Sequence, residues 1–283
     1  MKLRTIELFG GLGAFTKALE NLGIDYEIVD YVEIDKYAVN SFNAIHNTNF
    51  EPQDICEWNK DFKDIDFIMH GSPCQDFSLA GKNAGGDKGS GTRSSLMYET
   101  IRIVDKIKPK YVIWENVKNL LSKKHRHNFD AYLETLEKLG YNNYYQVLNA
   151  KDYGIPQNRE RVFTISIRKD IDKGSFCFPD KQELKVKLSD LLEDKVEDKY
   201  YISDDSIKKI TYEDSKEEES LHIKNNTKKG YLEAHNGDGC YISNIDKKRG
   251  TVQKKMIPTL KTSPDIGVVV NDYTKTSNKQ ITS

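Results

Sequence analysis

Residues 3–15 read LRTIELFGGLGAF and join a strand-like run to a glycine-rich turn and the start of a helix. We expect a strand over Leu3–Phe9 and an amphipathic helix over Phe15–Leu22, which Gly23 ends. Glycines allow the backbone to turn tightly and to approach a ligand, and a helix N-terminus offers free N–H groups. The stretch therefore predicts a ligand-binding strand–turn–helix unit at the start of an α/β domain.

The same alternation continues to about residue 180, which predicts an α/β domain over residues 1–180 with a mixed, mostly parallel sheet covered on both faces. Ligands then bind at the carboxyl ends of the strands. Further strands are expected at Glu27–Val32, Phe67–His70, Tyr111–Glu115 and Val162–Ile167, and further helices at Lys36–His46, Leu96–Ile107 and Phe129–Leu139.

Beyond residue 180 the sequence becomes rich in Lys, Asp, Asn and Ser, and its apolar segments become short and β-like, as at Ile266–Val270. We expect residues 181–283 to form a second, smaller and partial domain whose last stretch, Asn271–Ser283, frays. Residues 221–283 carry 11 basic and 5 acidic residues, although the whole chain has a net charge of −1. This basic surplus indicates either a surface that binds a polyanion or a lysine-rich surface that is only solvated.

Composition excludes several classes of protein. The chain has 283 residues, of which 37% are hydrophobic, so it can bury a substantial core. No apolar run approaches the roughly 20 residues that cross a bilayer, and no signal peptide precedes the first strand, so we expect a cytoplasmic protein without membrane contact. The cysteines, Cys56, Cys74, Cys177 and Cys240, form no CxxC pair, so neither a metal site nor a disulfide framework is expected.

The turn at residues 10–15 predicts a nucleoside-containing cofactor. Glu33 follows Gly13 by 20 residues, the spacing of a carboxylate that binds ribose hydroxyls. Thr16 stands where the dinucleotide pattern has its third glycine, which disfavours NAD and leaves an NAD-dependent dehydrogenase as a distant alternative. Asp54 is a candidate acceptor for an adenine amino group. The alternative for the glycine turn is that it only packs the helix onto the sheet. The alternative for Asp54 is that it is an ordinary turn aspartate.

Reactive side chains follow other strands. Cys74 lies in HGSPCQDFS (residues 70–78), directly after an apolar strand, where a thiolate can serve as a nucleophile. The other three cysteines are interpreted as small buried apolar residues. Glu115 ends the strand at residues 111–115, and Arg159 and Arg161 share one side of an extended segment. These arginines can pair with Glu115, hold an anion or form surface ion pairs.

Taken together, these motifs resemble those of the cytosine-C5 DNA methyltransferases of bacterial or phage restriction–modification systems. The matching stretches are ELFGGLGAF (7–15), YVEIDKYAV (31–39), GSPCQDFS (71–78), ENV (115–117), LNAKDYGIPQNRERVF (148–163) and SPDIGVVV (263–270). The resemblance is dense over about residues 3–180 and loose beyond. It implies an S-adenosylmethionine-dependent, Rossmann-like methyltransferase fold.

The resemblance also implies roles for individual residues. Those implied to bind S-adenosylmethionine are Phe9, Gly11, Leu12, Gly13, Glu33, Ile34, Asp54, Ile55, Gly71, Pro73 and Leu96. Those implied in catalysis are Cys74, the nucleophile, Glu115 at cytosine N3, and Arg159 and Arg161, which support the flipped base and its loop. Gln75 and Ser78 are implied to lie near DNA, and Leu79–Ser95 to close on it as a lid.

The implied reaction transfers a methyl group to C5 of a cytosine flipped out of duplex DNA, through a covalent bond between Cys74 and C6. Residues 181–270 are implied to read the recognition sequence in the major groove. An RNA (tRNA) cytosine methyltransferase of the same fold is a less favoured alternative, because residues 181–270 look longer than the equivalent region of RNA-directed relatives.

Two departures from the family pattern stand out. Ile34 occupies a position that is aromatic in many relatives, so apolar contact with adenine remains but stacking is lost. The family's usual C-terminal segments do not occur before Ser283. We therefore expect one chain of a split enzyme whose second polypeptide supplies them, a truncated product or a fragment. A truncated, inactive relative that binds DNA or a partner chain without turnover is the main alternative function.

Overall fold

The computed structural model describes residues 2–73, 93–194, 196–211, 220–241, 250–260, 266–270 and 280–282. The chain forms two compact units. The first comprises Met1–Leu148 and Glu160–Pro179, and the second comprises Asn149–Arg159 and Asp180–Ser283. The second unit therefore includes an excursion at residues 149–159 that sequence patterning does not separate from the α/β domain.

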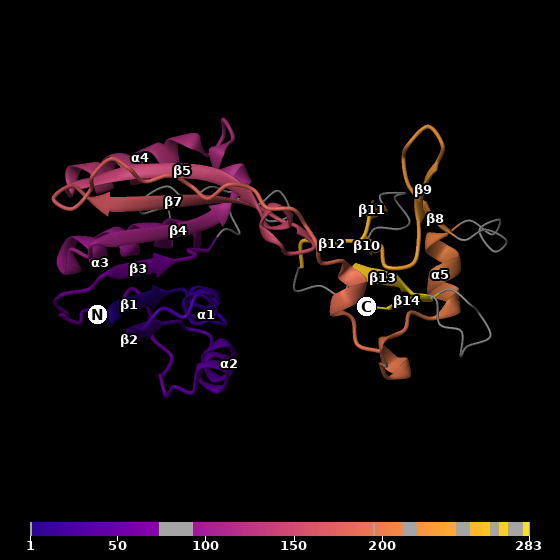
Figure 1. Cartoon of the computed structure of the whole chain (residues 1–283), viewed down its shortest axis with the longest axis horizontal. Coiled ribbons are helices and arrows are strands. Elements are labelled where there is room, and N and C mark those ends of the chain that lie inside the picture. Colours follow the sequence, from indigo (N-terminus) through magenta and orange to yellow (C-terminus); the bar gives the residue numbers. More distant parts are fainter. Residues whose placement is uncertain are drawn as a thin grey trace. The chain divides into compact units, whose positions relative to one another are not determined.

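The first unit contains a six-stranded sheet in the order β2-β1-β3-β4-β7-β5 (Figure 1). Strands β2, β1, β3 and β4 run parallel, and β7 runs antiparallel to β4. The predicted mixed, mostly parallel α/β fold is thus confirmed. The strands are β1 (Leu3–Leu8), β2 (Tyr26–Val32), β3 (Phe67–His70), β4 (Tyr111–Val117), β5 (Tyr141–Asn149) and β7 (Glu160–Arg168).

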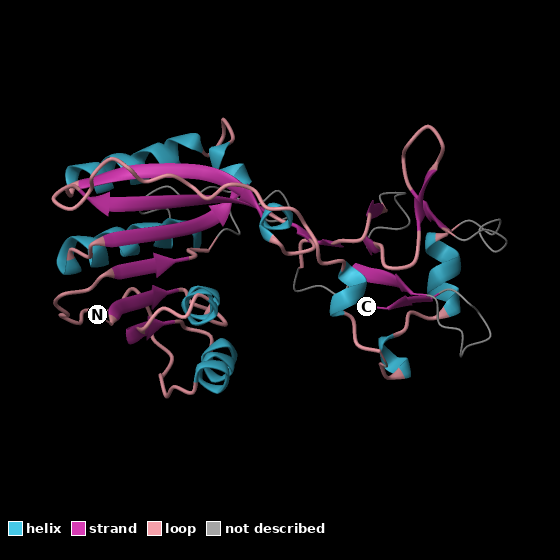
Figure 2. Ribbon diagram, viewed as in Figure 1, coloured by secondary structure: helices cyan, strands magenta, loops and turns pink. Residues whose placement is uncertain are grey.

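Helices cover both faces of this sheet (Figure 2). They are α1 (Ala14–Asn21), α2 (Lys36–His46), α3 (Met97–Ile107) and α4 (Arg126–Lys138). Successive strand residues point to opposite faces. On one face, Thr16 of α1 bonds Glu7 of β1, and Phe42 of α2 stacks on Tyr31 of β2 with ring centroids 3.8 Å apart.

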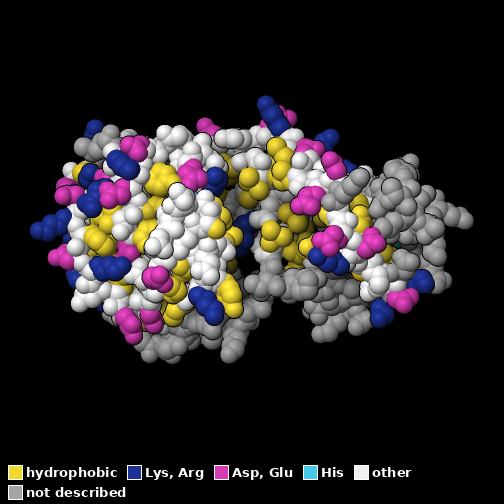
Figure 3. Space-filling model, turned by 90° about the horizontal axis from the view of Figure 1, so that it is seen from below, with side chains coloured by type: hydrophobic (Ala, Val, Ile, Leu, Met, Phe, Trp, Pro, Cys, Tyr) yellow, Lys and Arg dark blue, Asp and Glu magenta, His cyan; other side chains and the backbone are white. Residues whose placement is uncertain are grey.

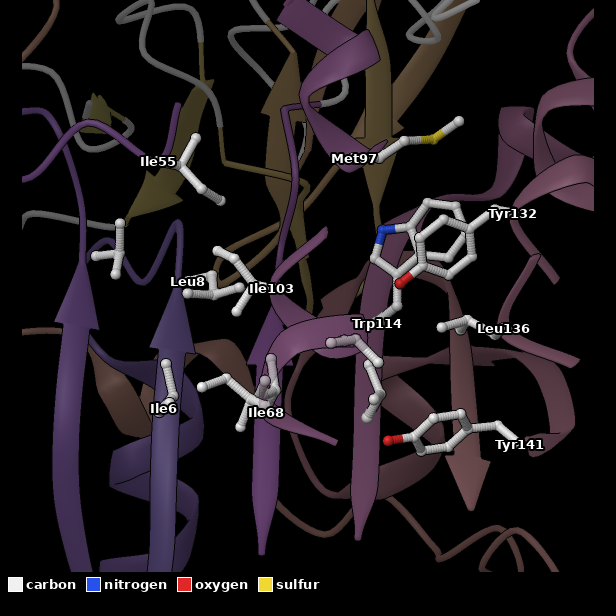
Figure 4. Close-up of a cluster of buried hydrophobic side chains, with 14 of the residues drawn as sticks. Ile6, Leu8, Ile55, Ile68, Met97, Ile103, Trp114, Tyr132, Leu136 and Tyr141 are labelled. Atoms are coloured by element: carbon white, nitrogen blue, oxygen red, sulfur yellow. The ribbon is translucent and has the colours of Figure 1, made fainter. Parts of the chain in front are cut away.

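The opposite face carries the main hydrophobic core (Figure 4). Ile6 and Leu8 of β1, Ile68 of β3 and Trp114 of β4 lie there side by side because the registers of the strands align them. Helices α3 and α4 close this layer. The helix residues buried in it are Met97, Ile103, Val104, Ile107, Phe129, Tyr132 and Leu136.

The elements at the β7–β5 edge of the sheet differ most from the expected pattern. Strand β5, YNNYYQVLN, was not predicted, because its polar residues break the apolar alternation. Strand β4 extends past Glu115 to Val117, and β7 begins at Glu160 rather than Val162, since the pairing of the two strands continues to Val117 and Arg161. Short 3₁₀ helices occupy Arg93–Leu96, Lys118–Leu121, Ala150–Tyr153, Leu188–Leu191 and Asp198–Tyr200.

The second unit is mainly β. Its four-stranded sheet has the order β11-β10-β13-β14, and two-stranded sheets pair β8 with β9 and β6 with β12. Gln280–Thr282 pairs with β13, so the expectation that all of residues 271–283 fray is wrong for that segment. The elements are β6 (Gln157–Asn158), α5 (Asp204–Ile210), β8 (Leu221–Lys224), β9 (Tyr231–Ala234), β10 (Gly239–Tyr241), β11 (Thr251–Gln253), β12 (Ile257–Pro258), β13 (Ile266–Val270) and β14 (Gln280–Thr282).

The cysteines divide by environment. Cys240 is buried in the core of the second unit, as predicted. Cys56 and Cys177 are exposed, which contradicts their interpretation as buried apolar residues. Cys56 lies in a turn and Cys177 in an irregular segment, where no strand or helix carries the side chain into a core.

The surface of the first unit carries both signs of charge. Figure 3 shows basic and acidic side chains interspersed over it, and ion pairs such as Lys60–Asp30 and Lys110–Asp66 join some of them. Within the described ranges, no helix combines the length and apolar character needed to span a membrane.

We expect Ile68→Ala to lower the free energy of unfolding by about 2–5 kcal/mol, because Ile68 is fully buried in the middle of the sheet and its truncation leaves a cavity. Urea denaturation measures the change. Ile45→Ala, at an exposed position of α2, is the control and should change stability by less than about 0.5 kcal/mol. Equal losses for both variants would contradict the assigned core.

Candidate active site

The predicted site residues of the first unit meet at one edge of the sheet. The registers place Leu8 of β1 beside His70 of β3, and His70 beside Trp114 of β4. The glycine turn after β1, the Gly71–Pro73 segment after β3 and Glu115 near the end of β4 therefore lie along the same edge. This is the edge at which parallel α/β sheets bind ligands.

The glycine turn has a conformation that demands glycine at one position in particular. Gly13 has φ 78°, and a Cβ built there would lie 2.5 Å from both the His46 ring and the Phe42 ring. Phe9, with φ 54°, adopts the left-handed region although it has a side chain. The Phe9 N–H donates to Val32 O at 2.7 Å. These constraints direct the chain from β1 across the end of β2.

Glu33 is fixed by the backbone around it. Its Oε1 accepts from the N–H groups of Ile34 (2.9 Å) and Asp35 (3.0 Å), and its Oε2 accepts from the Gly11 N–H at 3.3 Å. A carboxylate has about four acceptor positions, so these three donors leave room for one more. Glu33 thus joins the glycine turn and keeps acceptor capacity for a hydroxyl group.

The segment that carries Asp54 and Ile55 lies beside Glu33. The Gln53 N–H donates to Glu33 O at 2.8 Å, and Ile55 is buried. Asp54 accepts from the Cys56 N–H at 2.8 Å, which is the bond of an ordinary turn aspartate. The predicted cofactor residues at positions 11, 33, 54 and 55 are thus brought together.

Sequence reasoning missed the residues that hold this segment. Buried Asp30 of β2 accepts from Gln53 Nε2, Trp58 Nε1 and Lys60 Nζ at 2.7–2.9 Å. Arg102 of α3 donates to Ile55 O and Trp58 O, both at 2.8 Å. An acidic residue inside an apolar strand was the only signal for this role in the sequence.

The apolar residues that follow Gly11 and Glu33 in the sequence remain accessible. Leu12 is 60% exposed and Ile34 is 67% exposed, although both are large and hydrophobic. Leu96, at the start of α3, is partly buried against the main core. A carboxylate with spare acceptor capacity next to open apolar side chains suits a ribose attached to a flat base.

Glu115 and Arg161 form an ion pair at the other end of the site. Arg161 Nε lies 3.1 Å from Glu115 Oε1, and both side chains are mostly buried. The two residues are diagonal neighbours on the antiparallel β4–β7 pair. A Cβ built on Gly71 would lie 4.0 Å from Glu115 Oε2, so the segment leading to Cys74 passes this carboxylate.

The structure separates the two predicted arginines. Arg161 belongs to the first unit and pairs with Glu115, as one of the sequence interpretations proposed. Arg159 belongs to the second unit. Its N–H donates to Asn149 Oδ1 at 3.0 Å, and its carbonyl accepts from the Ala150 N–H at 3.1 Å, which closes the 149–159 excursion.

Ser72 is tied to β4 by buried hydrogen bonds. Trp114 Nε1 donates to Ser72 Oγ at 3.0 Å, and Asn116 Nδ2 donates to Ser72 O at 3.3 Å. Ser72 and Asn116 are 3% and 1% exposed. The pair therefore fixes the backbone two residues before Cys74, and neither residue was predicted to belong to the site.

His70 anchors the same segment from inside the core. Its Nε2 lies 2.8 Å from the Tyr132 hydroxyl, and its ring stacks on Trp114 with an interplanar angle of 8°. Complete burial lowers the pKa of His70 to about 3, so the ring is neutral at physiological pH. The base of the Gly71–Pro73 segment is therefore uncharged and closely packed.

The remaining predicted residues fall partly outside the structure's described ranges. Pro73 is described and partly buried. Cys74, Gln75 and Ser78 lie outside the described residues, as does most of the expected lid, residues 79–92. In the part of the chain that is described, no group of three or more His, Cys, Asp or Glu side chains is arranged to hold a metal ion.

Comparison with known proteins identifies the family. The profile of the C-5 cytosine-specific DNA methylases matches residues 3–283. Type II methyltransferase M2.ScrFI of Lactococcus lactis subsp. cremoris is 38% identical over an alignment of 259 positions that covers 72% of this chain and 71% of that protein. Orphan methyltransferase M.SPRI of Bacillus phage SPR is 35% identical over 243 residues, 75% of this chain and 55% of that protein.

Type II methyltransferase M.HhaI of Haemophilus parahaemolyticus is 42% identical over 194 residues, 67% of this chain and 57% of that protein. The chain thus spans between 55% and 71% of the length of these relatives. It belongs to the C-5 cytosine-specific DNA methylase family, as its motifs indicated.

Solved structures show the same fold. Dnmt2 methyltransferase of S. pombe superposes with a TM-score of 0.58 at 22% identity, covering 73% of this chain and 64% of that chain. A putative DNA modification methyltransferase encoded within an E. coli prophage gives 0.57 at 22% identity, covering 80% of this chain and 62% of that chain.

We expect Asn116→Ala to lower the free energy of unfolding by about 1–3 kcal/mol, because it leaves the buried Ser72 carbonyl without its side-chain donor. Thermal or urea unfolding measures the loss. The control is Asn40→Ala on the exposed side of α2, which should be within about 0.5 kcal/mol of the parent. Unchanged stability of Asn116→Ala would disprove the tie between Ser72 and β4.

Proposed function

We propose that this chain transfers a methyl group from S-adenosylmethionine to C5 of a cytosine in duplex DNA. The observation that carries the proposal is the Glu115–Arg161 pair, which lies beside the segment leading to Cys74. The same sheet edge carries the Glu33 carboxylate and the glycine turn. The family match and the names of the relatives support this activity.

The residues present fit S-adenosylmethionine. Glu33 would accept from a ribose hydroxyl, because it has acceptor capacity to spare. Asp54 and Ile55 would bind the adenine from one side, and Ile34 would cover it. The implied set also includes Phe9, Gly11, Leu12, Gly13, Gly71, Pro73 and Leu96. When bound, the cofactor supplies an electrophilic methyl group.

The protein's task is to make C5 of cytosine nucleophilic. The base must first leave the DNA stack, at a cost of a few kcal/mol. The Cys74 thiolate then forms a bond to C6, while the Glu115 carboxyl group hydrogen-bonds at N3 and draws electron density from the ring. C5 takes the methyl group and loses its proton to a base. Departure of the Cys74 thiolate from C6 restores the ring.

Arg161 orients the carboxyl group for this step. Its guanidinium holds Oε1 of Glu115 at 3.1 Å, which fixes the direction of the carboxyl plane. We place Arg159 of the second unit with the flipped base and its loop, and Gln75 and Ser78 near the DNA. Residues 181–270 would read the recognition sequence.

The test is transfer of a tritiated methyl group to mixed-sequence duplex DNA by the purified chain. Cys74→Ala should abolish transfer, because no thiolate adds to C6, while the affinity for S-adenosylhomocysteine stays within about twofold of the parent. Cys177→Ala, at an exposed cysteine, is the control and should retain full transfer.

Duplex DNA that carries 5-fluorocytosine should trap the parent chain covalently, because fluorine cannot leave C5 as a cation. Methylation by Cys74→Ala would disprove the nucleophile. Cofactor and DNA binding without transfer would indicate the inactive relative, and transfer restored by a neighbouring gene product would indicate a split enzyme. Transfer to tRNA but not to DNA would overturn the proposed substrate.

We expect Glu33→Gln to weaken S-adenosylhomocysteine binding by about 10–100-fold, because hydrogen bonds to a charged group are worth about 1.5–3 kcal/mol. Isothermal titration calorimetry measures the change. Glu27→Gln, at an exposed position of β2, the strand that precedes Glu33, is the control. Equal affinities for the two variants would remove Glu33 from the cofactor site.

A further inference from the structure

His46 connects three segments at the cofactor end of the first unit. It lies in the last turn of α2, and its side chain is 0% exposed. Its Nδ1 lies 2.8 Å from Glu20 Oε1 of α1, and its Nε2 lies 3.1 Å from the Leu12 carbonyl in the glycine turn. The ring thus bridges a carboxylate and the backbone of the proposed cofactor loop.

Both partners of the ring are hydrogen-bond acceptors. A backbone carbonyl has no proton to donate. Hydrogen bonds from Lys17, His46 and Tyr26 lower the pKa of Glu20 to about 2, so its carboxylate is ionised at physiological pH. A neutral imidazole has one N–H group and an imidazolium has two. Both contacts are therefore hydrogen bonds only when the ring carries two protons.

The ring also occupies the space beside the turn. A Cβ at Gly13 would meet His46 Nε2 at 2.5 Å, so the close packing of the ring excludes any side chain there. From the other side, the Tyr31 hydroxyl donates to Gly11 O at 2.6 Å and Glu33 accepts from the Gly11 N–H. The turn is thus held by β2 on one side and by His46 on the other.

We propose that the His46 imidazolium is a positioning residue for the cofactor turn, so that cofactor affinity depends on a single proton on its ring. The proposal rests on the proposed function of the turn in cofactor binding. When the ring carries two protons, both hydrogen bonds form. When it carries one, either the Leu12 or the Glu20 contact loses its donor and the turn loosens.

Other titratable groups face this ring. Glu20 of α1 contacts it directly and Glu7 of β1 interacts with it electrostatically, while Lys17 of α1 and Tyr26 of β2 hydrogen-bond to Glu20. Burial and the hydrogen bond to Glu20 raise the pKa of Tyr26 to about 12, so its hydroxyl stays protonated. Burial raises the pKa of Glu7, which makes it the one neighbour that also requires a control. Replacement of His46 distinguishes a pH effect of His46 from one of Glu7, because Glu7 remains in that variant.

The experiment measures the dissociation constant of S-adenosylhomocysteine between about pH 5.5 and 8.5, across the range in which histidine ordinarily titrates. The parent should lose about tenfold in affinity as pH rises, since a charge-assisted hydrogen bond is lost. His46→Gln should bind weakly at all pH values and with a flat profile.

Two further variants sharpen the test. Glu20→Gln should flatten the profile, because the amide can donate to Nδ1 while the neutral ring still donates from Nε2 to the Leu12 carbonyl. His127→Gln, at an exposed histidine of α4, should keep the parent profile. Identical profiles for the parent and His46→Gln would overturn the proposal, since a ring that only fills space has no pH-dependent effect.

Nuclear magnetic resonance of the ligand-free chain gives a second readout. The amide signal of Gly13 should shift with the same midpoint as the His46 ring, and this coupling should vanish in His46→Gln. A Gly13 signal that ignores the ring would also overturn the proposal. Failure of every variant to bind S-adenosylhomocysteine would instead contradict the proposed function, while the ligand-free measurement still decides the role of His46.

Discussion

The register between β1, β3 and β4 is the constraint on which the site depends. Because Leu8, His70 and Trp114 lie in register on adjacent strands, three segments far apart in sequence emerge at one edge of the sheet. A slip of one residue in any pair would turn the core residues of that strand toward the other face. The apolar core on α3 and α4 therefore stabilises the geometry of the candidate active site as well as the fold.

Buried polar groups fix the loops that follow the strands. Asp30 collects three donors from the segment around Asp54, and Asn116 holds Ser72 to β4. Each is costly to bury without its partners, so each specifies one arrangement of the loops. His46 belongs to this group, but both of its partners are acceptors, and this makes its contacts depend on protonation.

Much of the first unit could be predicted from the sequence. Lys36–His46 and Phe67–His70 were predicted with their observed bounds, because a clear apolar period and strong end signals coincide there. Strand β5 was missed because four of its nine residues are Asn or Gln and its pairing with β7 overrides local propensity. Motifs indicated Glu33 and Glu115. The partners of Asp30 and Asn116 are 23 to 44 residues away, so no local pattern reveals them.

The boundary between the two units has a consequence for the exchange of the second unit between relatives. The chain crosses that boundary at residue 149, returns at 160 and crosses again at 180. Strand β6, from the short excursion, pairs with β12 of the later segment. In a chimera that takes only the residues after 180 from a relative, the relative's β12 would have to pair with β6 of this chain. Exchange of the second unit between relatives must therefore replace both of its segments, residues 149–159 and the residues from 180 onward.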